Sequence, residues 1–306
     1  VPQISVVLGT CLGTNALNAA SADFVIMSEK AQLSLDVTGE NASAEYNAEH
    51  GIASVVAKDS AEAVAKAKEL VLYLPSNNLN TAPESFEEEP ADCDCIVGST
   101  VDGGSVYKLF DNYGKDAKVR LARLGGSVVG IVKTNGGVLS CPATTKIAKF
   151  VRFCDAFSLP ILTFVDCKGF ESIKSAAKAA SAYAEATTVK ISVVYGQAVG
   201  SGYIALAGTG ANADMVYALP QAVISPVNVE AAAFILAADA MNVPVAEQKA
   251  VAEKFAAENL SAFNAAQNGY VDGIVEQQDL RKALISALDM LAGKRVPTVA
   301  KKHSTI

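Results

Sequence analysis

Apolar runs of strand length alternate with amphipathic stretches along most of the chain. Runs rich in Val and Ile occur at Val1–Leu8, Pro160–Asp166 and Ile191–Gly196, and such runs are typical of buried strands. Between them, apolar residues recur every third or fourth position, as at Ser60–Leu74, which predicts amphipathic helices. Strands that alternate with helices predict an α/β layer structure with parallel pairing.

The same patterns place the remaining elements. We expect further helices at 144–157, 171–185 and 280–293, a helix-like run at 17–26, and strands at 32–37, 50–57 and 268–277. Leu121–Leu124 and Ser127–Val132 are expected to pair antiparallel through Gly125-Gly126. Asp59 or Ser60 would cap the helix that Pro75 ends.

A long-period repeat suggests two similar domains. ISVVLGTCLGTN at Ile4–Asn15 is echoed by ISVVYGQAVGSGY at Ile191–Tyr203, so that Gly13 falls on Gly200, and an Ala-Asp dipeptide follows each copy. One repeat at such a distance indicates paired domains rather than a solenoid. In both copies a buried strand runs into glycines.

The most linker-like stretch separates the copies. Residues 76–95 combine Pro, Asn and Ser with a run of three glutamates, so we divide the chain into a first domain (1–80), a linker (81–95) and a second domain (96–306). Residues 96–190 precede the second copy, whereas three residues precede the first. We therefore expect the first domain to be incomplete at its N-terminus, with the chain a fragment or the missing half-domain supplied by another chain.

Composition and charge narrow the class of protein. Hydrophobic residues make up 51% and charged residues 19% of the 306 residues, and the net charge is −7. This charge, and the lack of a basic stripe along the sequence, argue against a nucleic-acid or anionic-membrane partner. The apolar runs are far shorter than the roughly 20 residues of a membrane helix. We expect a soluble, cytoplasmic protein.

The cysteines predict no metal. Most of the six lie in apolar segments, which is typical of small buried side chains in a reducing compartment. Cys93 and Cys95 could begin a zinc site, but His50 and His303 are the only histidines and both lie far away in sequence.

The two glycine turns could hold a negatively charged oxygen. Glycines let the backbone adopt positive φ, and the first N–H groups of a following helix lack intrahelical partners. Gly13-Thr14-Asn15 and Gly200-Ser201-Gly202 could each form an oxyanion hole. Alternatively, the glycines only permit close packing of strand and helix. Neither turn is a dinucleotide or P-loop motif.

Further motifs resemble a known family. KFVRFCDAFSLPILTFVDCKGF at Lys149–Phe170 resembles the signature of carboxyltransferase subunits of biotin-dependent acyl-CoA carboxylases and decarboxylases. AYAEATTVKISVV, GSGYIALAG, ADMVYALP, NGYVDGIV and, in the first half, HGIASVVAKDSAEAVAKAKELVLYLPSNN match in order. The resemblance implies tandem crotonase (ClpP/crotonase-like) domains, each a ββα superhelix.

The resemblance also implies a reaction and a site. A carboxyl group would pass between biotin and an acyl-CoA through enolates held by backbone amides, without a side-chain acid or base. Gly13 and Thr14 would form the hole for the thioester oxygen, and Ser201 and Gly202 the hole facing the biotin ureido oxygen. The family usually has Gly at the position of Thr14 and Gly-Ala at that of Ser201-Gly202.

Other positions would contact the substrate. By resemblance these are Gly200, Tyr203, Ile204, Gly169 and Phe170. Ile204 could equally be a core residue, and for Tyr203 core packing is favoured over contact with a ligand ring. Asp155 and Asp166 could form an acid pair, although an Asp at the end of a strand more often accepts turn amides.

The implied assembly contains several chains. Biotin would be carried on a separate carrier protein or domain, with a CoA thioester as substrate. The first domain of one subunit would face the second domain of another in a dimer-based homo-oligomer such as a hexamer. A biotin carboxylase or a membrane decarboxylase subunit could join it.

A non-catalytic structural subunit of such an assembly is the alternative. Lys168 replaces a proline of the family pattern, a segment after Phe170 has no counterpart, and Glu40–Gly51 is a shortened form of a glycine-rich segment. These segments border the CoA and biotin pockets in the family, so their loss favours a modified substrate or a scaffold.

Overall fold

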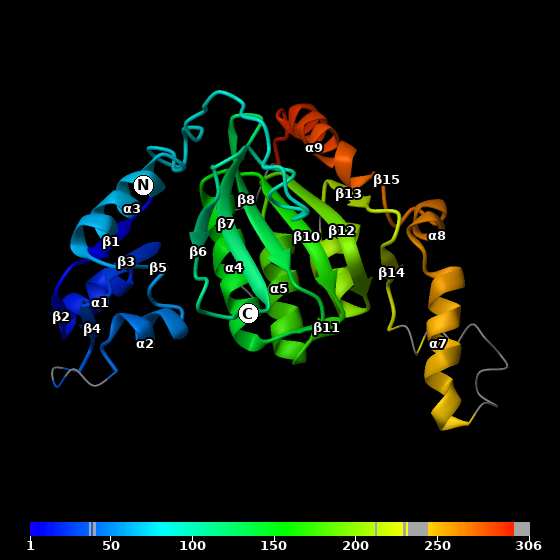
Figure 1. Cartoon of the computed structure of the whole chain (residues 1–306), viewed down its shortest axis with the longest axis horizontal. Helices are drawn as coiled ribbons and strands as arrows, with labels where there is room; N and C mark the ends of the chain where they lie inside the picture. Colours follow the sequence, from blue (N-terminus) through cyan, green and yellow to red (C-terminus); the bar gives the residue numbers. More distant parts are fainter. Residues whose placement is uncertain (37, 39–40, 212, 229–230, 232–243, 297–306) are drawn as a thin grey trace.

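The computed structural model describes residues 1–36, 38, 41–211, 213–228, 231 and 244–296. Figure 1 shows a small α/β unit formed by the N-terminal part of the chain beside a large sheet formed by its middle. The C-terminal helices flank the large sheet. We call the N-terminal α/β part the first unit, and the large sheet together with the C-terminal helices the second unit.

The first unit contains two small parallel sheets. One has the order β1-β3-β5, with β1 at Ile4–Val7, β3 at Phe24–Ser28 and β5 at Val55–Ala57. The other pairs β2 (Thr10–Leu12) with β4 (Gln32–Ser34). Its helices are α1 (Thr14–Ala20), α2 (Ala44–Glu49) and α3 (Ser60–Val71).

Several expectations for this unit need correction. The helix-like run at 17–26 was wrong in its second half, because α1 ends at Ala20 and the fully buried Phe24–Ser28 forms β3. The predicted strands at 32–37 and 50–57 keep only three residues each. The cap of α3 is Asp59, whose side chain accepts a hydrogen bond from the Glu62 N–H.

The second unit is built on an eight-stranded sheet with the order β15-β13-β12-β10-β8-β7-β6, while β14 pairs with the end of β12. Its strands are β6 (Tyr107–Leu109), β7 (Ala117–Leu124), β8 (Ser127–Thr134), β10 (Ile161–Cys167), β12 (Lys190–Val199), β13 (Met215–Ala218), β14 (Val223–Ser225) and β15 (Gly273–Ile274). Only β6–β7 and β7–β8 pair antiparallel, so the predicted hairpin is confirmed. A further short parallel pair joins β9 (Val138–Leu139) to β11 (Gly169–Phe170).

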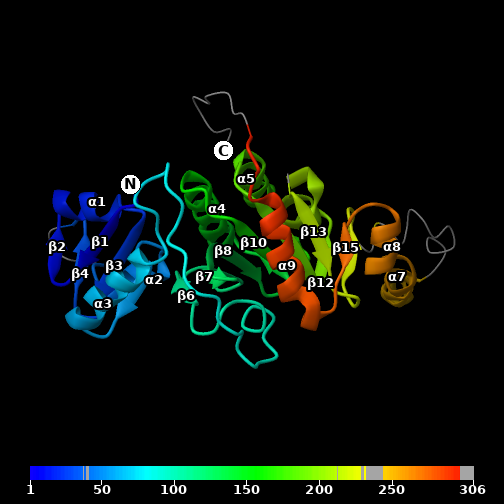
Figure 2. The same ribbon diagram turned by 90° about the horizontal axis from the view of Figure 1, so that it is seen from above.

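Helices cover both faces of this sheet. Figure 2 shows α4 (Cys141–Ala156) and α5 (Ile173–Glu185) on one side and α9 (Gln277–Leu291) on the other. The remaining helices are α7 (Val245–Asn259), α8 (Ala262–Gln267), a π-helical turn η1 (Tyr203–Ala207) and a 3₁₀ turn η2 (Thr209–Ala211). Of the helices described, none combines the length and the apolar character needed to cross a membrane.

The helix boundaries follow from caps. α4 begins three residues before the predicted Thr144, because the Ser140 side chain accepts from the Ala143 N–H and Pro142 occupies the first turn. Ser172 caps α5 in the same way, through the Ser175 N–H.

The two units share a core. Phe24 of the first unit meets Phe153 of α4 edge-to-face, with ring centroids 4.6 Å apart. The Tyr73 hydroxyl donates to the Ser105 carbonyl, and the Tyr107 hydroxyl donates to the Lys66 carbonyl. The first unit is therefore packed and hydrogen-bonded against β6 and α4.

The predicted linker, 81–95, is tied to the second unit. The Arg281 guanidinium of α9 forms ion pairs with Glu87 and with the buried Asp102, at 2.9 and 2.8 Å. Asp102 also accepts from the N–H groups of Gly125 and Gly126 in the β7–β8 turn. The glutamate run is thus anchored at one end rather than only solvated.

The internal repeat is confirmed in three dimensions. The Asp23 carboxylate, just before β3, accepts from the Gln3 N–H at 2.7 Å. The Asp214 carboxylate, just before β13, accepts from the Lys190 N–H at 2.8 Å. Each Asp therefore joins the starts of two neighbouring parallel strands.

The cysteines are less buried than the sequence suggests. All six are free thiols, and only Cys154 and Cys167 are buried. Cys93, Cys95 and Cys141 are exposed.

Candidate functional site

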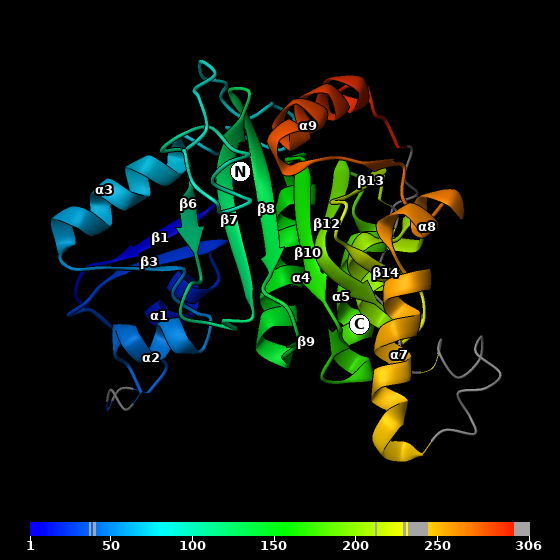
Figure 3. The same cartoon turned by 45° about the vertical axis from the view of Figure 1, so that its right-hand side comes forward.

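The strongest candidate site lies where β8, β10 and β12 end, which is visible from the side in Figure 3. The three strands run parallel, so their carboxyl ends share one edge of the sheet. The loops that follow are joined by hydrogen bonds from the Gly136 N–H to the Asp166 carbonyl and from the Lys168 N–H to the Gly137 carbonyl. Open parallel sheets bind ligands at this edge.

The second glycine turn presents free donors there. Gly200 adopts φ +52° and donates its N–H to the Ser225 carbonyl at 2.9 Å. A helical turn starts at Ser201 and continues into η1. In the part of the chain that the structure describes, the N–H groups of Ser201 and Gly202 have no hydrogen-bond acceptor. These two groups can bind an oxygen atom of a ligand.

Two glycines keep this turn close to β10 and β11. A Cβ at Gly169, where φ is +142°, would lie 3.4 Å from the Ser201 Oγ. A Cβ at Gly202 would lie 2.9 Å from the Cys167 carbonyl oxygen and 3.0 Å from its Sγ. The structure therefore brings the predicted residues Gly169, Ser201 and Gly202 together, and it leaves little room for a side chain at 202.

The first glycine turn has the same architecture with fewer donors. Gly13 has φ +65° and ψ −139°, and its N–H donates to the Ser34 carbonyl at 2.9 Å. Gly13 is thus not a free donor, which corrects the prediction for this residue. Thr14 begins α1, and within the described residues its N–H has no acceptor.

One chain does not bring the two turns together. β2 leads into the first turn and β12 into the second, and these strands lie on opposite sides of β6, β7 and β8 in Figures 1 and 2. A ligand that contacts both turns would therefore have to lie between two copies of the chain.

The predicted substrate contacts have different environments. Tyr203 is a core residue, since it is only 6% exposed and its hydroxyl donates to the Tyr270 carbonyl. Ile204, in contrast, is 52% exposed. Phe170 is partly buried and its strand pairs with β9. Of these three, Ile204 offers the most surface to a ligand.

The two aspartates do not form an acid pair. Asp166 accepts from the Gln197 N–H at one end of β10, whereas Asp155 accepts from the N–H groups of Thr187 and Thr188 near the other end. The Asp155 carboxylate organises the loop before β12, and the Asp166 carboxylate binds the backbone of β12 itself. Within the described ranges, no group of three or more His, Cys, Asp or Glu side chains could hold a metal ion.

Sequence reasoning missed two residues of the site. Cys167 is buried against the turn, and burial raises the pKa of its thiol to about 11, so the thiol stays protonated. Ser225 supplies the carbonyl that binds the Gly200 N–H. The signal for Cys167 was its place directly before Lys168 and Gly169; nothing in the sequence pointed to Ser225.

Comparison with known proteins decides the family. The whole chain, residues 1–306, matches the family described as Carboxyl transferase domain. The chain belongs to this carboxyl transferase family. Its relatives include the alpha subunit of methylmalonyl-CoA decarboxylase from Veillonella parvula, 33% identical over all of this chain and 68% of the relative. The mitochondrial propionyl-CoA carboxylase beta chain of Homo sapiens is 31% identical over all of this chain and 65% of the relative.

Solved structures of carboxyl transferases share the fold. The transcarboxylase 12S structure, described as a hexamer assembly with hydrolysed methylmalonyl-coenzyme A bound, superposes with a TM-score of 0.89. It is 31% identical and is matched by all of this chain and 68% of its own. The predicted α/β fold of the tandem crotonase-like type is confirmed.

Proposed function

We propose that this carboxyl transferase moves a carboxyl group between biotin and a small acyl-CoA, as a component of a carboxylase or decarboxylase. The observation that carries the proposal is the second glycine turn, where Ser201 and Gly202 present N–H groups that have no acceptor among the described residues and lie beside Gly169. The relatives that are named for methylmalonyl-CoA and propionyl-CoA reactions support the substrate class.

The second turn fits the ureido group of biotin. Its two adjacent N–H donors match a single acceptor oxygen, and the absence of a side chain at Gly169 leaves Ser201 accessible. Biotin on a carrier protein would supply both the carried carboxyl group and the base. Ser201 and Gly202 would hold the charge that develops on the ureido oxygen, and one such donor is worth about 3 kcal/mol of barrier.

The first turn would hold the thioester oxygen. Thr14 supplies the donor, and Gly13 positions Thr14 through its bond to Ser34. Because the turns lie in different units, the site would form between the first unit of one subunit and the second unit of another. A dimer-based homo-oligomer follows, and the hexamer of the 12S relative supports it.

The acyl group would be small and neutral. Ile204 is exposed and apolar and lies two residues beyond Gly202, so contact with it favours an uncharged alkyl group over a second carboxylate.

A transfer assay tests the proposal. The protein, with its carrier and any partner subunits, is incubated with methylmalonyl-CoA and biotinylated carrier, and propionyl-CoA formation is followed by chromatography. The expected result is product formation that depends on biotin. If no short acyl-CoA gains or loses a carboxyl group under these conditions, the chain is a scaffold and the proposal is wrong.

A further inference from the structure

Four basic side chains meet on one face of the large sheet, and we call them the basic block: Lys108, Lys118, Arg120 and Lys133. Lys108 of β6 lies directly opposite Arg120 of β7, and Lys118 of β7 lies directly opposite Lys133 of β8. Residues directly opposite on antiparallel strands project to the same face. The block does not show as a basic stripe along the sequence, because strand pairing aligns residues that are far apart in the chain.

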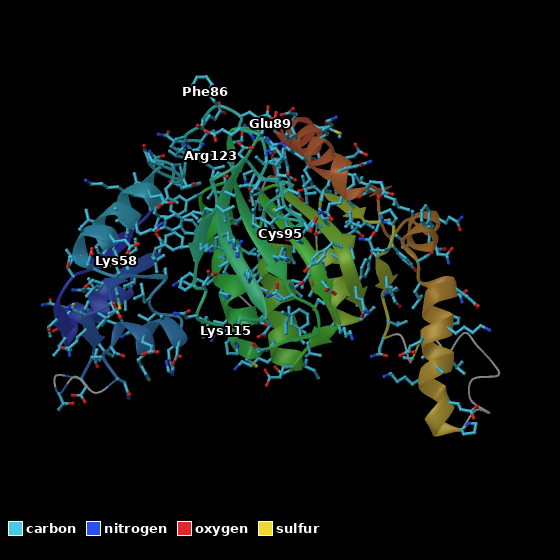
Figure 4. All side chains as sticks on the ribbon, in the orientation of Figure 1. Lys58, Phe86, Glu89, Cys95, Lys115 and Arg123 are labelled. Carbon is cyan, nitrogen blue, oxygen red and sulfur yellow. The ribbon has the colours of Figure 1, made fainter. Side chains whose placement is uncertain are left out.

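The basic block lies beyond the apolar cover of this face. Further along the same strands, Ala122, Leu124, Val129 and Ile131 are buried in a cluster with Ile96–Val101 and α9. Figure 4 labels Cys95, at the end of that covering segment, in front of the sheet. Hydrogen bonds with the backbone of Gly98 and Val97 lower the pKa of the Cys95 thiol, and the charges of Lys133 and Arg120 lower it further. The side chains of the basic block lie outside the covered area and are exposed or only partly buried.

The charges of the block are not neutralised by carboxylates of the residues that the structure describes. Within the described part of the chain, none of the four side chains forms an ion pair with a carboxylate. The Arg120 Nε is buried and has no hydrogen-bond partner there. Lys133 places its Nζ 5.3 Å from the centre of the Tyr195 ring. Like charges directly opposite one another on a sheet are destabilising, so the free protein carries unfavourable contacts that a bound anion would relieve.

The dimensions of the basic block indicate the size of ligand that it can bind. Three neighbouring strands span about 10 Å, and Lys118 and Arg120 are separated by about 7 Å along β7. An area of this size suits two linked phosphate groups and is much smaller than a protein interface. Guanidinium and ammonium groups are the usual phosphate ligands.

We propose that the basic block binds the pyrophosphate group of a small molecule, such as a nucleotide or coenzyme A. This site uses none of the residues of either glycine turn, although Lys133 is the penultimate residue of β8. Comparing the binding of inorganic pyrophosphate, ADP, coenzyme A and orthophosphate shows which of these molecules supplies the pyrophosphate group.

Calorimetric titration tests the site. Inorganic pyrophosphate should bind saturably at 20 mM salt and weaken about tenfold or more at 500 mM salt, since the screening length shortens to a few ångströms. Arg120→Gln and Lys133→Gln should each weaken binding about tenfold. Lys58→Gln, which removes the same charge from the first unit (Figure 4), should not change it. Orthophosphate should bind more weakly than pyrophosphate.

Thermal unfolding separates binding from a structural role. Without ligand, Arg120→Gln should melt at the same temperature as the native protein or higher, because a like-charge contact is removed. It should also lose the stabilisation that pyrophosphate gives the native protein. The proposal is overturned if pyrophosphate does not bind, if Lys58→Gln weakens binding equally, or if Arg120→Gln melts lower and keeps the full ligand effect.

Discussion

The two glycine turns have the same backbone plan in different surroundings. In both, a glycine with positive φ donates its N–H to the last residue of a parallel neighbour, Gly13 to Ser34 and Gly200 to Ser225. The first turn follows a three-residue strand in a two-stranded sheet, whereas the second follows the ten-residue β12 in the eight-stranded sheet. The repeat therefore encodes the turn, and the surrounding sheet determines how firmly the turn is held.

The difference bears on catalysis. Donors stabilise a developing charge best when they need no reorganisation. The second turn, with two free N–H groups held against Cys167 and Gly169, is the better prepared of the two. The first turn offers Thr14 and would need a second copy of the chain to complete a site.

The largest effect should come from removing a donor in the second turn. Gly202→Pro deletes the N–H and should lower carboxyl transfer by about 100-fold to 1,000-fold relative to Gly202→Ala. Alanine is the matched control, since it adds a Cβ that meets the same Cys167 atoms but keeps the N–H. Initial rates of the two purified variants measure the ratio. Equal rates would show that this N–H is not used.

The corresponding change in the first turn should have a smaller effect. Thr14 is the first residue of α1, where proline is well tolerated, so Thr14→Pro should fold. We expect transfer to fall about 100-fold relative to Thr14→Ala, from loss of one donor. Rates measured against acyl-CoA concentration test this. An unchanged rate would show that the Thr14 N–H does not bind the thioester oxygen.

The stability of the second unit should depend strongly on one buried lysine. The Lys146 ammonium donates to the carbonyls of Phe110, Tyr113 and Ala117. Lys146→Met removes these three hydrogen bonds, and the Phe110 carbonyl keeps only the one from the Tyr113 N–H. The substitution should lower the free energy of unfolding by about 3 kcal/mol, measured by urea denaturation at pH 7. Lys68→Met on the exposed side of α3 is the control and should change stability little.

The pH dependence of stability gives a further check on Lys146. Burial lowers its pKa to about 8 from the model-compound value of 10.5. Between these two values the unfolded chain binds more protons, so stability contributed by this group rises with pH from about 8 to 10.5. Lys190, whose pKa burial also lowers to about 8, adds a rise of the same sign. In Lys146→Met the rise should become shallower; an unchanged slope would contradict this origin.

The smallest effect should be the difference in stability between alanine variants of the two turn glycines, Gly13 and Gly200. Gly13 combines φ +65° with ψ −139°, a region that is nearly restricted to glycine, so Gly13→Ala should cost about 2–3 kcal/mol. Gly200→Ala should cost about 1 kcal/mol, because the nearest atom to its added Cβ is 3.6 Å away. Thermal unfolding of both variants measures the difference. The reverse order would mean that the sheet around the second turn resists the change more than the backbone does.

The sequence predicted the repeat, the α/β class, the hairpin and the location of the second turn. Strand runs and caps are local signals, which is why Asp59 and the glycine pair 125–126 were identified. The sequence motifs assigned Gly169 and Ser201 to the same site. The structure places them side by side, because each follows a buried strand and the two strands are parallel neighbours.

Other features depend on pairing that no local signal records. Whether the Gly13 N–H is free depends on where Ser34 lies, and the role of Tyr203 depends on Tyr270, 67 positions away. The basic block depends on the register of β6, β7 and β8. Phe24–Ser28 was misassigned in part because a short buried run has no distinctive period.

The central claim, that free N–H groups of the second turn bind the biotin oxygen, is tested most directly by amide NMR with ¹⁵N-glycine labelling. Adding biotin should shift the Gly202 amide proton downfield, because it acquires an acceptor. The Gly200 and Gly13 amides, which already donate to Ser225 and Ser34, should stay in place. A Gly202 amide that does not move at a biotin concentration that saturates transfer would contradict the account.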